Sequence, residues 1–192
     1  MKMNWLGWLV MIALLAACRP YQFKGTEYPG NVPAYDFTLQ DSEGRPFQLS
    51  ARDEEIALLF WGYTSCPDVC PVTLAEAGQI IQALGDDAEQ VVFLFITVDP
   101  ERDTPELLGQ YTATFHPDII GLTGTPEELA AAREAYGVYA AKVPLENSAA
   151  GYSMDHSARV FLVDGNGRLR LSYAYGTPAG DIAQDIRYLL KQ

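Results

Sequence analysis

Two cysteines and one histidine are the residues of this chain best suited to redox or metal chemistry. Cys66 and Cys70 follow an apolar run and precede a segment, Pro71 to Leu84, whose spacing predicts a helix. On a helix, residues four apart lie on nearly the same face, about 6 Å apart along the axis. The positive end of a helix also favours thiolates. The pair is therefore suited to form a disulfide or to hold a soft metal ion between two sulfurs.

The number of thiols restricts which metal the pair could hold. Thiolates select Cu(I), zinc or iron–sulfur centres, but zinc and iron–sulfur centres usually need four protein ligands. The chain has 3 cysteines in total, and reduced copper accepts two or three ligands, so copper fits best. A plain stabilising disulfide between Cys66 and Cys70 is the alternative, although such a short loop gives little entropic stabilisation.

His156 lies in the segment expected to face the two thiols. It belongs to residues 152–157, directly before a strand predicted at 158–163. A thioredoxin-type enzyme would use Cys-x-x-Cys and place a cis-proline in that segment, which here contains no proline. We therefore expect His156 to be a third ligand, with a structural histidine as the alternative. His116, at a predicted helix end, is expected to cap that helix or face solvent.

Strands and helices alternate along the chain in the order that positions these residues. The pattern is hairpin, then β-α-β-α-β-α, then hairpin and helix, and such alternation implies a parallel core with crossover helices. The sequence therefore predicts an α/β, thioredoxin-like fold with an added N-terminal β-hairpin. Expected strands cover 35–39, 47–49, 56–61, 91–98, 119–122, 158–163 and 169–175; expected helices cover 71–84, 105–115, 126–136 and 178–190; an irregular loop is expected over 142–153.

Residues 1–17 read as a lipoprotein signal peptide. One lysine precedes an apolar run from Trp5 to Ala17, which is shorter than the roughly 20 residues that span a bilayer. The run ends in a lipobox-like sequence before Cys18, which would carry the lipid; ordinary cleavage or an uncleaved anchor is the alternative. Residues 18–30 are then expected to be a tether and residues 31–192 the domain. With Cys18 lipidated, Cys66 and Cys70 remain as a pair in an oxidising compartment.

The charge of the chain excludes one class of partner. Its formal net charge is −12, whereas binding to phosphate backbones requires a basic face. We therefore expect no nucleic-acid partner. The absence of coiled-coil repeats or an evident interface stripe predicts a monomer.

Four sequence blocks, in order, resemble the Sco/SenC family. They are Gly62 to Pro71, Val98 to Pro105, Gly121 to Gly124 and Asp155 to Ser157. The resemblance implies an extracytoplasmic, membrane-attached, thioredoxin-like protein that helps to assemble the binuclear copper centre of cytochrome c oxidase.

The resemblance also assigns Cys66, Cys70 and His156 as copper ligands for Cu(I), Cu(II) or both. Many members of the family are attached by a transmembrane helix, whereas this chain would be lipid-anchored on the periplasmic face of a bacterial membrane.

Two activities agree with this assignment. The first is a metallochaperone that passes copper to the copper-centre subunit of the oxidase. The second is a thiol–disulfide reductase that keeps the cysteine ligands of that subunit reduced, with Cys66 and Cys70 as its redox pair. Either activity implies further partners, a copper donor and a thiol reductant. Asp99 and Asp103 fit ordinary turn and cap residues, but their roles and that of Asp68 stay open.

Overall fold

The computed structural model describes residues 20–30, 32–52, 55–146 and 148–192. Within these residues, a six-stranded sheet has the strand order β1-β10-β9-β4-β5-β6. Its strands are β1 (Thr26–Glu27), β4 (Ile56–Gly62), β5 (Val91–Thr97), β6 (Ile119–Leu122), β9 (Arg159–Val163) and β10 (Leu169–Ala174). The strands β4, β5 and β6 are parallel, and β9 joins β4 antiparallel. A parallel core with an antiparallel side is therefore present, as the sequence predicts.

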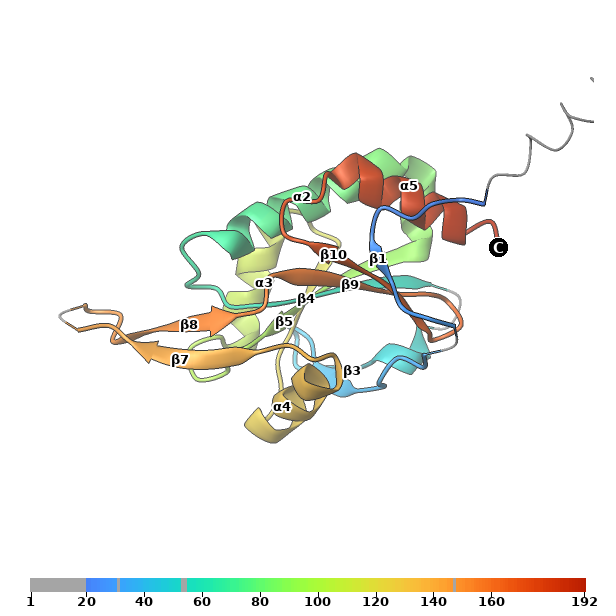
Figure 1. Cartoon of the computed structure of the whole chain (residues 1–192). Coiled ribbons are helices and arrows are strands. Elements are labelled where there is room, and N and C mark those ends of the chain that lie inside the picture. The colour runs from blue at the N-terminus through green and yellow to red at the C-terminus, as the bar shows by residue number, and fades with distance from the viewer. Residues whose placement is uncertain (1–19, 31, 53–54, 147) are drawn as a thin grey trace, which may run out of the picture.

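Helices cover both faces of this sheet. They are α2 (Val69–Leu84), α3 (Pro105–Ala113), α4 (Pro126–Ala135) and α5 (Ala179–Leu189), with short 3-10 helices at Leu49–Ala51 and Gly85–Gln90. The helices α2 and α5 pack side by side over one face, and α4 lies on the other (Figure 1). Near α4, β2 (Thr38–Gln40) pairs antiparallel with β3 (Pro46–Gln48), in the region where the sequence predicts a hairpin.

The central strand β4 ends directly before the turn that carries the thiols. All seven of its residues are buried, because helices cover both faces of a strand in the middle of such a sheet. It runs parallel to β5 in a register that pairs Gly62 with Thr97. Both strands therefore end at the same edge of the sheet, and the cysteine turn and the loop after β5 meet there.

The irregular loop predicted over 142–153 is wrong at both ends of that range. The structure has a hairpin there, formed by β7 (Ala140–Pro144) and β8 (Tyr152–His156), which projects from the sheet (Figure 1). Among the side chains of the two strands, only that of Met154 is buried. Strand β7 reads Ala-Ala-Lys-Val-Pro and shows no alternation of apolar and polar residues. The alternation in β8 extends over only five residues, so the sequence pattern predicts a strand there only weakly.

The described residues of the predicted tether, 20–30, pack against the rest of the chain. Strand β1 pairs with β10, and the ring of Tyr21 stacks on Tyr188 of α5 at a centroid distance of 3.9 Å. The fully buried carboxylate of Asp185 accepts hydrogen bonds from the Tyr21 hydroxyl at 2.7 Å and the Lys24 amide at 2.9 Å. This segment therefore belongs to the domain, through contacts that are 161 to 164 residues apart in sequence.

Cys18 and the predicted signal peptide lie outside the described residues. No helix within the described part of the chain is long and apolar enough to cross a membrane.

Candidate metal centre

The two cysteines lie on either side of the beginning of α2. Cys66 is in the turn between β4 and α2, and Cys70 is in the first turn of the helix, which begins two residues earlier than predicted. The Cys70 amide donates to Cys66 Sγ at 3.4 Å. Cys70 is fully buried and Cys66 is partly exposed, and both are free thiols. The disulfide expected for the oxidised pair therefore stays a prediction.

His156 reaches the thiols from the end of β8. Its Nε2 atom lies 3.4 Å from Cys70 Sγ, and its Nδ1 atom lies 3.2 Å from the carbonyl oxygen of Ser157. Because a carbonyl only accepts hydrogen bonds, Nδ1 of the neutral ring carries the proton and Nε2 presents its lone pair to the sulfurs. The rings of Phe60 and Tyr63 meet the imidazole at centroid distances of 6.0 and 5.8 Å. The ring is thereby held in an orientation suited to a ligand.

The ligand atoms of these three residues converge on one point. The two Sγ atoms and a histidine nitrogen all lie within 4.8 Å of one another. Two metal–sulfur bonds of about 2.3 Å each would span at most about 4.6 Å, so a small inward shift would close the set around one ion. Two thiolates and one imidazole suit copper better than zinc, which usually takes four protein ligands. The structure thus brings together all three predicted ligands.

The two thiols have opposite protonation preferences. A hydrogen bond from Cys70 lowers the pKa of Cys66 to about 3, helped by the backbone amides of Asp68 and Cys70. The hydrogen bond to Cys66 raises the pKa of Cys70 far above its usual value, and burial and the charge of Cys66 raise it further. The metal-free pair therefore keeps one proton, on the buried sulfur, and exposes one thiolate.

Gly62 is a site residue to which the sequence analysis assigned no role. A Cβ atom at this position would lie 2.8 Å from Cys70 Sγ and 2.6 Å from a ring carbon of Phe95. Glycine is needed here because it lets the end of β4 approach the buried sulfur. The glycine at the end of the apolar run could have indicated this role, since a glycine in a strand often marks a close approach of the backbone to another group.

Asp103 fixes the cysteine turn. Its buried carboxylate accepts hydrogen bonds from the Thr64 hydroxyl at 2.5 Å, the Thr64 amide at 3.2 Å and the Thr97 hydroxyl at 2.6 Å. Burial raises the pKa of Asp103, while the hydrogen bonds from Thr64 and Thr97 oppose that shift. Asp103 is not the helix cap, which is its neighbour Thr104; its side chain instead joins the loop after β5 to the cysteine turn.

Asp99 makes both a local and a long-range contact. It is buried and forms an ion pair with Arg102, and it accepts a hydrogen bond from the Tyr152 hydroxyl at 2.7 Å. Asp68, in contrast, is exposed and makes no capping hydrogen bond from its side chain. His116 lies outside the centre, where its Nδ1 accepts from the Asp118 amide at 3.3 Å.

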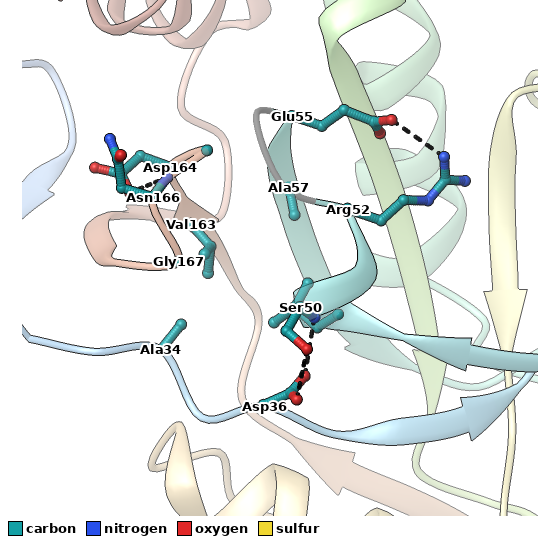
Figure 2. Close-up of a pocket in the computed structure, with 12 residues that line it drawn as sticks. Ala34, Asp36, Ser50, Arg52, Glu55, Ala57, Val163, Asp164, Asn166 and Gly167 are labelled. Atoms are coloured by element: carbon teal, nitrogen blue, oxygen red, sulfur yellow. Dashed lines mark hydrogen bonds and ion pairs between the residues drawn. The ribbon is translucent and has the colours of Figure 1, made fainter.

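A pocket of about 410 Å³ lies at the opposite end of the sheet (Figure 2). Its walls come from the start of β4 and the turn after β9, with Ala57 and Val163 paired across the two strands. The carboxylate of Asp36 is already bonded to Ser50 and Gln48. The lining has no thiol and no imidazole, so it is not suited to a soft metal.

Comparisons with known proteins agree with the site. Residues 27–191 match the SCO1/SenC family. A SCO2-like protein of Rickettsia prowazekii is 35% identical over 148 residues, which cover 77% of this chain and 72% of that protein.

Two solved structures are similar in sequence and in fold. One is Bradyrhizobium japonicum ScoI with copper bound, which has a TM-score of 0.75 and 37% identity and covers 82% of this chain and 99% of that one. The other is apo Sco1 of Thermus thermophilus, which has a TM-score of 0.79 and 35% identity and covers 90% and 99%. Because the family match extends over most of the chain and includes all three converging ligands, the protein belongs to the SCO1/SenC family.

Proposed function

We propose that this protein is a copper-binding metallochaperone for cytochrome c oxidase, with Cys66, Cys70 and His156 as the ligands of the copper that it carries. The single observation that carries the proposal is the convergence of two thiol sulfurs and an imidazole nitrogen within 4.8 Å. The copper bound to the Bradyrhizobium relative supports the choice of metal. Family membership supports delivery to the copper-centre subunit of the oxidase.

The donor set explains how cargo could be held and given up. Two thiolates favour Cu(I), and the imidazole, a harder donor, allows Cu(II) to bind as well. Oxidation of Cys66 and Cys70 to a disulfide would remove both sulfur ligands at once. The protein would therefore hold copper only while the pair is reduced.

Copper titration tests the proposal directly. The reduced full chain in detergent is titrated without oxygen with Cu(I) and then with Cu(II), beside the variant His156→Ala. We expect one copper per chain with submicromolar affinity. A wild-type protein that takes up no copper would contradict the proposal, whereas equal binding by His156→Ala would contradict only the assignment of that ligand.

A thiol–disulfide reductase is the second candidate, and the unequal thiols favour it. Cys66 is partly exposed with a lowered pKa, as an attacking thiolate should be, and Cys70 is buried with a raised pKa. The Cys66 thiolate would attack a substrate disulfide, form a mixed disulfide and release one substrate thiolate. Cys70 would then lose its proton and attack Cys66 Sγ, which releases the second substrate thiolate. The substrate gains two electrons, the pair becomes a disulfide, and a separate thiol reductant must restore it.

The reductase candidate is tested with a disulfide-bonded copper-centre subunit and no copper. We expect stoichiometric reduction by the wild type. The variant Cys70→Ser should instead form a stable mixed disulfide through Cys66, detected by mass spectrometry. Failure of both reactions would leave copper transfer as the function.

We also propose that Cys18 carries lipid and attaches the protein to the periplasmic face of a bacterial membrane. The support is the lipobox-like sequence that ends at Cys18. Mass spectrometry of the membrane-extracted protein should find a diacylated or triacylated cysteine at its N-terminus. An unmodified Cys18 would contradict the proposal.

A further inference from the structure

We propose that Asp99, Arg102 and Tyr152 form a latch that positions His156 and so sets how fast copper is released. This inference rests on the proposed copper site. The three residues are positioning residues, because none of them belongs to the ligand set itself.

The latch joins β8 to the loop after β5 by contacts to a single tyrosine. The Tyr152 hydroxyl donates to Asp99 Oδ1 at 2.7 Å. Arg102 donates from Nη1 to the Tyr152 carbonyl at 3.0 Å, and its guanidinium lies over the Tyr152 ring at 3.9 Å from the centroid. Arg102 also forms an ion pair with Asp99. Tyr152 is therefore held at its ring, its hydroxyl and its backbone.

The hairpin that carries His156 has little else to hold it. Its strands pack mainly on each other, and Met154 is the buried residue among them. Two further contacts are polar: Tyr63 and Ser153 share a hydrogen bond of 3.1 Å, and Lys142 pairs with Glu101 at 2.5 Å. The exposed pair should add little stability. The apolar contacts are those of Ala140 and Tyr152, which are partly buried against the core, and of the Phe60 and Tyr63 rings with His156. Apolar burial, which normally fixes a strand, is thus limited to one buried and two partly buried side chains.

The loop at 99–103 also holds the cysteine turn, so it links the two halves of the ligand set. The Asp99 amide donates to the Thr97 hydroxyl at 2.9 Å, and the Asp103 amide donates to the Asp99 carbonyl at 3.0 Å. Asp103 in turn binds Thr64, two residues before Cys66. A continuous set of hydrogen bonds thus runs from Tyr152 to the cysteine turn.

From this arrangement, the latch controls the distance between the imidazole and the sulfurs. With the latch closed, His156 Nε2 lies 3.4 Å from Cys70 Sγ. With it open, the hairpin is free to move away while both cysteines stay in place. Copper would then be held by two sulfurs alone, a set to which an accepting protein could add its own ligand.

Two variants weaken the latch at different contacts. Tyr152→Phe removes the hydroxyl but keeps the ring under Arg102. Arg102→Lys keeps the positive charge but loses the planar guanidinium that stacks and donates in two directions. For each variant we expect copper to transfer to a competing chelator about tenfold faster than from the wild type, and the spectrum of bound Cu(II) to show weaker nitrogen ligation. Unchanged release and an unchanged spectrum in both variants would overturn the proposal.

Arg170→Lys is the matched control. The side chains of Arg170 and Arg102 are both 24% exposed, and each pairs with a buried aspartate, which for Arg170 is Asp164 at 2.8 Å. Arg170 lies on β10 and makes no contact with the ligands. We expect copper release at the wild-type rate from this variant. A tenfold change here would show that loss of any buried arginine pair has the same effect, which would also overturn the proposal.

A double-mutant cycle separates positioning from general stability. If the latch acts through His156, Arg102→Lys should not change copper release further once His156→Ala is present. An additional tenfold effect in that background would contradict the proposal.

Hydrogen exchange tests the latch without copper. In the metal-free full chain, backbone amides of β7 and β8 should exchange about tenfold faster in Arg102→Lys, while those of α2 stay unchanged. If exchange is faster in Arg102→Lys but the wild type takes up no copper, the proposed function is contradicted, whereas the role of the latch in holding the hairpin is not. Normal copper uptake with unchanged exchange would contradict the latch alone.

Discussion

The cysteine half and the histidine half of the metal centre are held by different kinds of force. The cysteine turn lies between a fully buried strand and a 16-residue helix, and Cys70 is itself part of the core. His156 ends a hairpin that has one buried side chain and is docked by polar contacts. The free energy gained by burying apolar groups depends little on their orientation. The strength of a hydrogen bond, in contrast, depends strongly on the angle at which donor and acceptor meet. The positions of the two sulfur atoms should therefore be fixed, whereas the position of the imidazole nitrogen should be adjustable.

The largest effect should follow the loss of a core ligand. Cys70→Ser removes a soft ligand that no neighbouring side chain replaces, so we expect stoichiometric copper binding to be abolished. His156→Ala should still bind copper, but its affinity for Cu(II) should fall by at least about 100-fold. Mutation of a residue that only supports a metal ligand lowers affinity by at most about that factor. Equal losses in the two variants, measured by anaerobic titration, would remove the distinction between the halves.

The pH dependence of copper uptake should come from the buried sulfur. The pKa of Cys66 is lowered to about 3, so this thiol is already ionised above about pH 4, whereas the raised pKa of Cys70 keeps its proton through neutral pH. Copper must displace that proton, so the affinity for Cu(I) should rise about tenfold per pH unit from this group. Calorimetry in buffers of different ionisation enthalpy should find about one proton released by the pair, and two would contradict the assignment.

The packing around Cys70 should tolerate no added atom. Gly62→Ala places a methyl group 2.8 Å from Cys70 Sγ and 2.6 Å from Phe95, so the strand or the sulfur must move. We expect a loss of about 1–3 kcal/mol of unfolding free energy together with weaker binding of both copper oxidation states. Chemical denaturation and copper titration of the same sample check both effects. A variant with wild-type affinity would show that the cysteine half is less rigid than its burial implies.

The smallest effect on copper is expected at Asp185, where the N-terminal segment packs beside β10. Asp185→Ala leaves the Tyr21 and Tyr173 hydroxyls and the Lys24 and Gly25 amides without their acceptor. Because this carboxylate is fully buried, we expect a loss of about 3 kcal/mol in stability with unchanged copper affinity at temperatures where the protein is folded. A parallel fall in affinity would show that this contact is coupled to the metal centre.

The sequence by itself determined the parts that depend on local pattern. The apolar runs of β4 and β5, the helix that follows the cysteines, and the proline-initiated helices α3 and α4 all have signals within a few residues. The ligand set followed from counting cysteines and from the place of His156 before the late strand. The parallel core with an antiparallel side followed from the alternation of elements.

Only the tertiary structure decided what holds the ligands in place. Asp99 and Asp103 have the composition of ordinary turn residues, and their roles depend on Tyr152 and Thr64, which lie 53 and 39 residues away. The hairpin and the docked N-terminal segment were missed for the same reason. Polar contacts across long sequence separations leave no periodic pattern in the sequence, because a hydrogen bond needs only one suitable partner at one position. A hydrophobic face, in contrast, needs apolar residues repeated at regular spacing.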